Sequence, residues 1–473
     1  MNPCLRRAAG STFVGLSVLL VVLSGCASVA PRNSPSTLAT ATAPRQTTLV
    51  VALYPYVPRI DQFEKAIAAA WSKAHPDIAL SFLSANDWDG GYAIDPPANA
   101  DVFVFDAVFL DFFRSRGWLE PMSAREIVDL GDFVPYAIAG VEQGGQYYAI
   151  PQLGCANILF YQQSDSALAE AETLTEVKNA LSECTYSSKI PPDRRGLMID
   201  MSGGSTNACL YLDIAHSLTG QFPLPLPPSL AEVNPTAMSN MRLLLALASY
   251  PNGTSGMSVP YEQATWFSQG WGRALIGYTE SMSAMSDETL AGIGFKVMPF
   301  SDNDQQALFY ADVIGVNPTS RQRSTRDLAV ELANIMAASS TMVASIGPDG
   351  GKSPQFLMAA RPSVFDTLGR SFPIYSRMYD LIAANRPIMF GLNEQSRAWF
   401  AAMKNPIRGD ARKDYPCHCD YPATQPIPDN SAAPAICDST CASRGGWAGT
   451  WTNQYPAAPT GSSVCGCNAC PVP

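Results

Sequence analysis

Short runs of β-branched and aromatic residues alternate with amphipathic helical patterns through most of this 473-residue chain. Residues 49–53 form a continuous apolar run that predicts a buried strand, and Phe63, Ile67 and Trp71 mark one face of a following helix. Further strands are predicted over 78–83, 101–105, 157–161, 196–200, 273–279 and 309–316, with helices over 108–118, 238–248 and 326–338. Repeated strand–helix–strand order indicates parallel sheets covered by helices.

The cysteines divide the chain into a large body and a small tail. Twelve cysteines suit an oxidising compartment. Only Cys155, Cys184 and Cys209 lie in the long middle section, and pairing of the last two would leave Cys155 as a free thiol. Seven others crowd into the C-terminal end: Cys417, Cys419, Cys437, Cys441, Cys465, Cys467 and Cys470. We therefore predict a body over 49–408 and a Cys-rich module over 411–473.

The body has roughly 360 residues, which is more than a single core usually holds, so two α/β lobes with a cleft between them are expected. This layout resembles the periplasmic solute-binding fold, and residues 266–278 look like the helix, glycine turn and strand common in that superfamily. The predicted fold class is therefore α/β: a two-lobed fold like that of periplasmic solute-binding proteins, with an interlobe cleft and the small C-terminal module in addition.

The N-terminus has the pattern of an export signal. Arg6 and Arg7 precede a short apolar run, and residues 23–26 (Leu-Ser-Gly-Cys) resemble a bacterial lipoprotein processing box. The resemblance implies a signal peptide over 1–25, lipid attachment at Cys26 and a flexible tether over 26–48 that is rich in Ser, Thr, Ala and Pro. The expected location is the cell envelope, with ordinary secretion or a periplasmic location as the alternative.

Charge and composition exclude several functions. The net charge of -10 argues against a nucleic-acid partner, since phosphate binding needs a basic surface. Only three histidines occur, His75, His216 and His418, so histidine-based catalysis and histidine-rich metal sites are not expected.

Four segments carry a more specific signal. They are residues 53–58 (Leu-Tyr-Pro-Tyr-Val-Pro), 101–106 (Asp-Val-Phe-Val-Phe-Asp), 150–161 (Ile-Pro-Gln-Leu-Gly-Cys-Ala-Asn-Ile-Leu-Phe-Tyr), and 277–282 with 309–313. In order and spacing, from about residue 48 to 405, they resemble the thiaminase I (thiamine pyridinylase) family. The resemblance implies a transferase that replaces the thiazole of thiamine by another nucleophile, an amine, pyridine or thiol, and that needs no cofactor or metal.

By this resemblance Cys155 is the nucleophile and Glu280 the base. Cleaving thiamine requires a nucleophile that adds to the electron-poor pyrimidine, and a thiolate suits this role. Glu280 would take the thiol proton, for which burial must raise its pKa. A buried apolar cysteine or half of a disulfide is the alternative for Cys155, and a solvated strand-end carboxylate for Glu280.

The resemblance also implies which side chains bind the substrate. Aromatic faces stack on a pyrimidine and attract a thiazolium cation, while carboxylates hold the amino group and balance the charge. The residues that match the family pattern are Tyr54, Tyr56, Tyr92, Asp106, Tyr261, Tyr278, Tyr310 and Asp312.

In the tail, disulfides are expected in place of a core, and zinc is the alternative reading of its cysteines. Residues 445–452 and 463–467 look like the repeat of cyanobacterial-type mannan-binding lectins. This resemblance implies contact of Trp447 and Trp451 with mannose-type glycans; otherwise both tryptophans fill a small core. The main alternative function for the whole chain is that of a non-catalytic lipoprotein that binds thiamine or a related cation, and a surface adhesin is a third.

Overall fold

We describe a computed structural model of the chain. The structure describes residues 47–181, 196–201, 203–247, 261–270, 272–303, 305–411, 420–453 and 463–467. The predicted signal peptide, Cys26, nearly all of the tether, Cys184, His418 and three tail cysteines (Cys417, Cys419 and Cys470) therefore lie outside the described residues.

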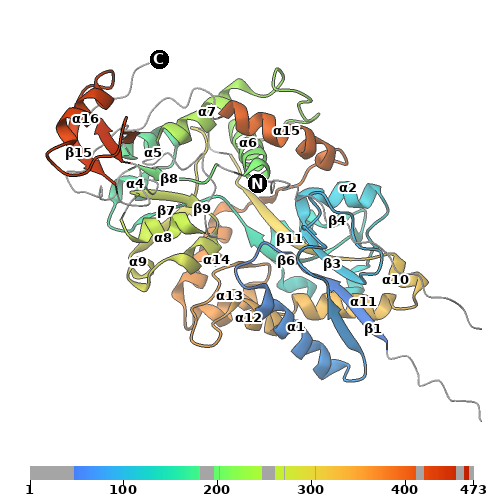
Figure 1. Ribbon diagram of the computed structural model, residues 1–473. Helices are drawn as coiled ribbons and strands as arrows, with labels where there is room; N and C mark the ends of the chain where they lie inside the picture. Colours follow the sequence, from blue (N-terminus) through green and yellow to red (C-terminus); the bar gives the residue numbers. More distant parts are fainter. Residues whose placement is uncertain are drawn as a thin grey trace, which may run out of the picture. The chain divides into compact units, whose positions relative to one another are not determined.

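The larger sheet has seven strands, and its order is β12-β6-β11-β3-β1-β2, with β13 paired to β11 (Figure 1). Its strands are β1 (Thr48–Ala52), β2 (Ala79–Phe82), β3 (Val102–Asp106), β6 (Ile150–Cys155), β11 (Leu308–Val316), β12 (Met358–Ala359) and β13 (Ile388–Met389). β11 runs antiparallel to both β3 and β6, whereas β1 is parallel to β2 and β3. The expectation of parallel sheets is therefore wrong in part, because the long strand β11 enters between β3 and β6 from the opposite direction.

The smaller sheet has four strands in the order β10-β7-β9-β8. They are β7 (Ile158–Gln162), β8 (Leu197–Met198), β9 (Ala274–Gly277) and β10 (Ile293–Val297). β8 and β9 are parallel, and β7 is antiparallel to β9 and β10. Since β6 belongs to the larger sheet and β7 to the smaller one, the chain passes from one sheet to the other at residues 156–157. Two α/β lobes with crossing segments confirm the predicted fold class.

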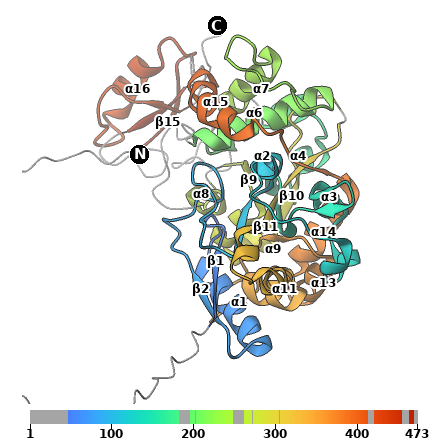
Figure 2. The ribbon, with the colours of Figure 1, turned by 90° about the vertical axis from the view of Figure 1, so that its right-hand side faces the viewer.

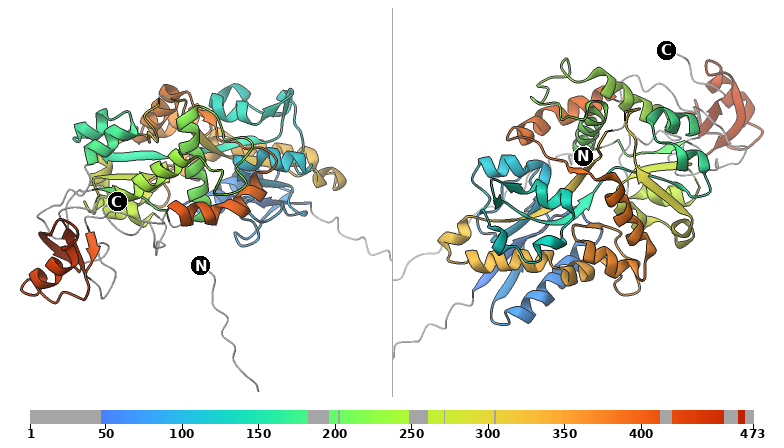
Figure 3. Two further views of the ribbon diagram at one scale, coloured as in Figure 1. Left: turned by 90° about the horizontal axis from the view of Figure 1, so that it is seen from above. Right: turned by 180° about the vertical axis from the view of Figure 1, so that it is seen from behind.

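Helices cover both sheets. Those of the larger sheet are α1 (Ile60–Ala74), α2 (Leu110–Ser115), α3 (Pro135–Gly140), α10 (Thr319–Gln322), α11 (Arg326–Ala337), α12 (Ser339–Ile346) and α13 (Pro362–Gly369). Viewed from behind, the yellow-to-orange helices α11 to α13 follow one another across this lobe and lead into α14 (Pro373–Asn385) (Figure 3, right). In the described part of the chain, no single helix is long and apolar enough to span a bilayer; α11 and α12 reach that length only together and meet at a bend of 55°.

The second lobe is covered by α6 (Gly204–Thr219), α7 (Pro235–Ala246) and α15 (Ser396–Ala411), which pack on one another (Figure 2). Its shorter helices are α4 (Ser166–Glu170), α5 (Leu174–Leu181), α8 (Glu262–Ser268) and α9 (Asp287–Ala291). Local sequence explains where α7 begins and where α6 ends. At the start of α7, the Asn234 side chain accepts hydrogen bonds from the amides of residues 236 and 237, with Pro235 in the first turn. Gly220 ends α6 in the left-handed conformation.

The C-terminal residues form a separate three-stranded sheet in the order β14-β16-β15. It consists of β14 (Asp420–Pro422), β15 (Trp447–Thr452) and β16 (Val464–Cys467), with helix α16 (Ala433–Cys441). Disulfides Cys437–Cys465 and Cys441–Cys467 join α16 to β16, so these four cysteines bridge, as expected, and are not zinc ligands. The predicted boundary near residue 410 falls at the end of α15 and remains a prediction.

Candidate functional site

A cavity of about 710 Å³ opens where the chain passes between the two sheets. Its walls include the last residue of β6, Cys155, together with Tyr310 and Asp312 of β11 from the larger sheet. From the smaller sheet come Gly277 at the end of β9 and Glu280 in the 3₁₀-helix that follows it (Thr279–Ala284). The predicted interlobe cleft is therefore this cavity.

All ten side chains proposed from the sequence for the cleft line this one cavity. They are Cys155, Glu280, Tyr54, Tyr56, Tyr92, Asp106, Tyr261, Tyr278, Tyr310 and Asp312. They come from both lobes and are spread over more than 250 residues of sequence, so their convergence is a property of the fold and not of local spacing.

Cys155 is a free thiol. Its Cα pairs with that of Tyr310 across the antiparallel β6–β11 ladder. Burial raises the pKa of this thiol well above its ordinary value, and the negative charges of Glu280 and Asp312 raise it further. Without a cation in the cavity, the thiol is therefore protonated at neutral pH and needs a base before it can act as a nucleophile.

Glu280 is suited to be that base. Its side chain is 7% exposed, and burial raises its pKa to about 7. One carboxylate oxygen, Oε2, has no hydrogen-bond partner among the described residues. A carboxyl group that titrates near neutral pH and keeps a free oxygen can accept and return a proton.

Two more carboxylates line the cavity, both on strands of the larger sheet. Asp106 ends β3, accepts a hydrogen bond from the Tyr92 hydroxyl (2.7 Å) and another from the Val108 amide (3.0 Å). Burial raises the pKa of Asp106 and, together with repulsion from Asp106, that of Asp312. Closely placed carboxylates that repel one another in a buried site favour a cationic ligand.

Aromatic rings form much of the remaining surface. Tyr54 and Tyr56 lie 5.3 Å apart, centroid to centroid, and Tyr56 and Tyr92 lie 6.3 Å apart, both pairs in edge-to-face geometry. Tyr278 and Tyr310 are 6.2 Å apart in the same geometry. Tyr56 is 56% exposed and the other rings are more buried, so the aromatic surface continues from the interior to the outside. Such walls suit a flat, positively charged ring system.

Three polar residues that line the cavity or bond to its lining were not predicted. The Asn157 amide donates to Asp213 Oδ2 on α6 (2.8 Å) and to the Tyr310 hydroxyl (3.4 Å). Asp213 is buried, and its pKa is raised to about 7 by burial. Gln263 at the start of α8 also lines the cavity. Asn157 lay within a segment that was singled out, but no sequence signal marked Asp213 or Gln263.

Cys209 also lines the cavity, as a buried free thiol. The pairing of Cys209 with Cys184 is therefore not formed. Cys155 is nevertheless unpaired. In the described residues, no three His, Cys, Asp or Glu side chains are grouped so that they could hold a metal ion.

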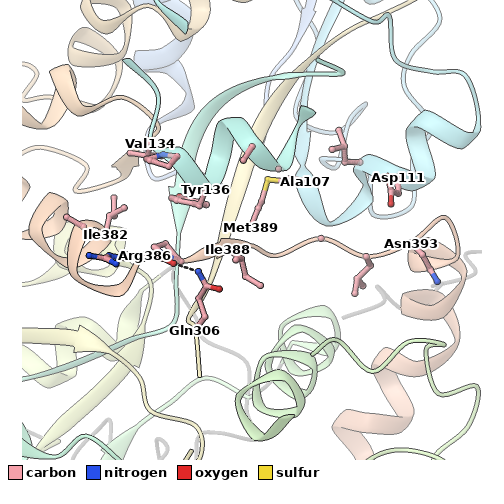
Figure 4. A pocket seen from close by; sticks show the side chains of 18 of the residues that line it. Ala107, Asp111, Val134, Tyr136, Gln306, Ile382, Arg386, Ile388, Met389 and Asn393 are labelled. Carbon is pink, nitrogen blue, oxygen red and sulfur yellow. Dashed lines mark hydrogen bonds between the residues drawn. The ribbon is translucent and has the colours of Figure 1, made fainter. Parts of the chain in front are cut away.

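A second cavity of about 900 Å³ lies apart from these residues, and Figure 4 shows its lining side chains, among them Ile388 and Met389 of β13 and Tyr136 of α3. None of the ten predicted residues lines it. Tyr136 connects the two regions, since its hydroxyl group reaches the Tyr310 carbonyl oxygen (3.5 Å) on the strand beside Cys155.

The two tail tryptophans are half-buried. Both pack against the cluster formed by the bridged cysteines, Ile427 and Ile436, and the Trp451 indole donates to Asn430 Oδ1 (2.9 Å). The structure thus gives both a role in the small core and leaves each residue partly exposed.

Comparison with known proteins gives a consistent result for the body. A family model described as the Thiaminase-1 domain matches residues 156–301. The chain is 34% identical over 398 residues to Thiaminase-1 of Paenibacillus thiaminolyticus. The aligned region covers 83% of this chain and 93% of that protein.

Solved structures agree. The structure of Clostridium botulinum thiaminase I in complex with thiamin is similar, with a TM-score of 0.71 and 35% identity over 78% of this chain and 99% of the other. The GacH receptor of Streptomyces glaucescens, a structure determined with and without acarbose, shares the fold with a TM-score of 0.56 at 16% identity over 78% and 94% of the two chains.

Proposed function

The chain belongs to the thiaminase I family, and we propose that it degrades thiamine by exchanging the thiazole for another nucleophile, with Cys155 as the attacking group. Family membership supports thiamine as the substrate. The observation that carries the chemical proposal is the position of a free thiol and a carboxyl of raised pKa in one cavity.

The reaction has to break the bond between the methylene carbon and the thiazolium nitrogen. The Cys155 proton passes to Glu280, and the thiolate adds to a ring carbon of the aminopyrimidine. The electron pair that enters the ring expels the thiazole as a neutral molecule, which leaves an exocyclic methylene on a pyrimidine that is still bound to sulfur. The acceptor then adds to this methylene, and the Cys155 sulfur leaves as the ring becomes aromatic again. The departing sulfur takes back the proton that Glu280 holds, and the regenerated carboxylate accepts the proton of the acceptor.

The positive charge of the substrate couples ionisation of the Cys155 thiol to substrate binding. In the empty cavity, burial and neighbouring carboxylates hold the pKa of Cys155 high. A thiazolium cation bound beside them stabilises anionic forms, so it lowers the pKa values of both Cys155 and Glu280. Ionisation of the nucleophile is thereby coupled to occupancy, which limits reaction of the thiolate in the absence of substrate.

The walls of the cavity supply binding. We assign the Tyr54, Tyr56 and Tyr92 rings to stacking and to attraction of the cation. Asp106 and Asp312 accept hydrogen bonds from the amino group and balance the positive charge. Tyr261, Tyr278 and Tyr310 are assigned to the wall around the sulfur.

Mass spectrometry of the intact protein and of its proteolytic peptides, after incubation with thiamine without an added acceptor, tests the proposal. We expect an added mass equal to the pyrimidinylmethylene group on the Cys155 peptide, and its removal when pyridine or aniline is added. A C155S variant is the control. Unmodified protein that nevertheless binds thiamine tightly would instead identify a solute-binding protein.

From the sequence pattern at residues 23–26 we also propose that Cys26 carries a lipid and anchors the protein at the cell envelope. Expression with a labelled fatty acid should label the wild-type chain and not C26A. A soluble, unlabelled wild-type product would contradict this proposal.

A further inference from the structure

The start of α8 contains two locally unfavourable features that adjoin the cavity. Tyr261, directly before the helix, has a backbone φ of 58°, in the left-handed region that side chains other than glycine rarely occupy. Gln263 is 5% exposed, and its Nε2 has no hydrogen-bond partner among the described residues. A buried amide donor without a partner is unfavourable for folding and calls for a functional explanation. Both residues line the cavity.

The position of α8 brings this region close to the reacting pair. α8 packs on β9 and on the 3₁₀-helix that contains Glu280, and the Thr265 hydroxyl donates to the Ala284 carbonyl oxygen (3.2 Å). Besides burial, the charges of Glu280 and Cys155 raise the pKa of the Tyr261 phenol, which places the start of α8 within the electrostatic reach of both. Cys155 and this segment line the same cavity, so a ring attacked by Cys155 would be within reach of the start of α8.

The hydrogen-bond donors and acceptors of the cavity determine which half of thiamine fits against the Gln263 amide. Asp106, Asp312 and Glu280 are acceptors when ionised, so they suit the amino group and the cation. An aminopyrimidine also has two ring nitrogens, which are acceptors and need donors. A thiazolium ring offers no nitrogen acceptor, and its positive charge repels the positive end of an N–H dipole. The free Gln263 amide therefore matches the pyrimidine half.

We propose that Gln263 is a substrate-contacting residue whose Nε2 donates a hydrogen bond to a pyrimidine ring nitrogen. This inference rests on the proposed function and deepens it. When sulfur adds to the ring, electron density moves onto the ring nitrogens, so the hydrogen bond becomes stronger as the adduct forms. Gln263 thus contributes to binding and more strongly to the rate of adduct formation.

Equilibrium binding tests the contact without chemistry. In a C155S background, the dissociation constants of thiamine and of 4-amino-5-(hydroxymethyl)-2-methylpyrimidine are measured by titration calorimetry, with and without Gln263→Met. Because methionine keeps the shape but removes the donor, we expect both ligands to bind about tenfold more weakly. Gln269, exposed directly after the same helix, provides the control Gln269→Met, which should change neither constant.

Two results would overturn the proposal. One is unchanged binding of both ligands; the other is weaker binding of thiamine with unchanged binding of the pyrimidine fragment, which would put Gln263 against the thiazolium half. Thermal melts verify folding, and Gln263→Leu provides a second variant without a donor if the methionine variant is unstable. Loss of fragment binding is again expected for it.

Single-turnover formation of the Cys155 adduct gives the kinetic readout. Gln263→Met should slow this step about 100-fold, which exceeds its effect on binding. Loss of rate no greater than loss of affinity would contradict the transition-state role. If the wild type binds the fragment through Gln263 but forms no adduct, the proposed thiol chemistry is wrong and the Gln263 contact is still supported. Failure of the proposed function can therefore be told apart from failure of the Gln263 proposal.

Discussion

Asp106 and Asp312 are direct partners in the antiparallel pairing of β3 with β11, so two carboxyl groups are fixed side by side on the wall of the cavity. Burial raises the pKa of each, and for Asp312 the charge of Asp106 adds to the effect. In the empty site this repulsion is unfavourable, and a bound cation relieves it.

Replacing either member of this pair should therefore weaken binding of a cation more than binding of a neutral ring. For D312N in a C155S background we expect the affinity for thiamine to fall about 10- to 100-fold, equivalent to ~1.4–2.7 kcal/mol. The neutral aminopyrimidine fragment should lose less. Calorimetric titration of both ligands measures the difference, and D87N, at an exposed position, is the control. Equal losses for the two ligands would show that charge is not the basis of recognition.

Cys155 should be required for turnover and not for binding. A serine hydroxyl is a much weaker nucleophile than a thiolate, so C155S should reduce kcat about 10³-fold or more. The dissociation constant of thiamine should stay within about threefold, since the sulfur is proposed to bond only during reaction. Steady-state kinetics and calorimetry measure the two effects. Because Cys209 also lines the cavity, C209S provides the matched control, and activity that is lost in C209S but kept in C155S would reassign the nucleophile.

The pH dependence of activity should follow Glu280. Its pKa of about 7 in the free enzyme means that kcat/KM falls about tenfold per pH unit well below pH 7, where the base is protonated. The kcat profile should have a lower midpoint, because bound thiazolium stabilises the carboxylate. E280Q should remove this limb and lower kcat about 10²- to 10⁴-fold. A limb that persists in E280Q would point to another group, of which Asp213 is the first to examine.

The same raised pKa has a consequence for stability. The pKa of Glu280 is higher when folded (about 7) than its ordinary value of 4.5, so its contribution to stability is fully present below pH 4.5 and is lost as the pH rises through 7. E280Q avoids this loss and should be more stable than the wild type at pH 8 by about 1–3 kcal/mol, with little difference at pH 4.5. Urea denaturation at the two pH values measures this.

The stability of the C-terminal module should depend on its disulfides. Disulfide Cys437–Cys465 closes a loop with a sequence separation of 28, and its removal should cost about 3 kcal/mol in the stability of the tail. If residues 411–473 fold separately, as the cysteine distribution predicts, C437S/C465S should leave kcat unchanged.

For the sugar-binding hypothesis, a glycan array should show mannose binding that W447A abolishes. Because both tryptophans also pack against the small core, thermal melts of W447A and W451A check that the tail is still folded.

Several strands with strong apolar patterns were predicted from the sequence, although β10 was missed. β1, β3 and β11 lie within two residues of their predicted ends. β6 was not predicted as a strand because Pro151 and Gly154 interrupt its pattern, although it carries the nucleophile. The ten site residues were predicted from the family pattern: eight lie in the four segments, and Tyr92 and Tyr261 lie outside them. Gln263 and Asp213 could not be found in this way, because their roles depend on a missing hydrogen-bond partner and on a contact across 56 positions.

The residue before the nucleophile on β6 has little space for a side chain. Gly154 precedes Cys155 on β6, and a Cβ atom at this position would lie 2.1 Å from the Tyr136 hydroxyl oxygen but 3.5 Å from the ring carbon that bears it. G154A should therefore force β6 or Tyr136 to shift, with a loss of about 1–3 kcal/mol in stability and a lower kcat.

Removing the Tyr136 hydroxyl group should reverse the loss of stability and activity expected for G154A. Y136F alone gives up one long hydrogen bond to the Tyr310 carbonyl oxygen and should cost about 1 kcal/mol. In the double variant G154A/Y136F the new methyl group occupies the space of the lost oxygen, so we expect more stability and activity than in G154A alone, with a coupling energy of at least ~1 kcal/mol. Strictly additive effects in thermal melts and in kcat would mean that Tyr136 does not limit the space at Gly154, and that the position of Cys155 is set by the β6–β11 ladder alone.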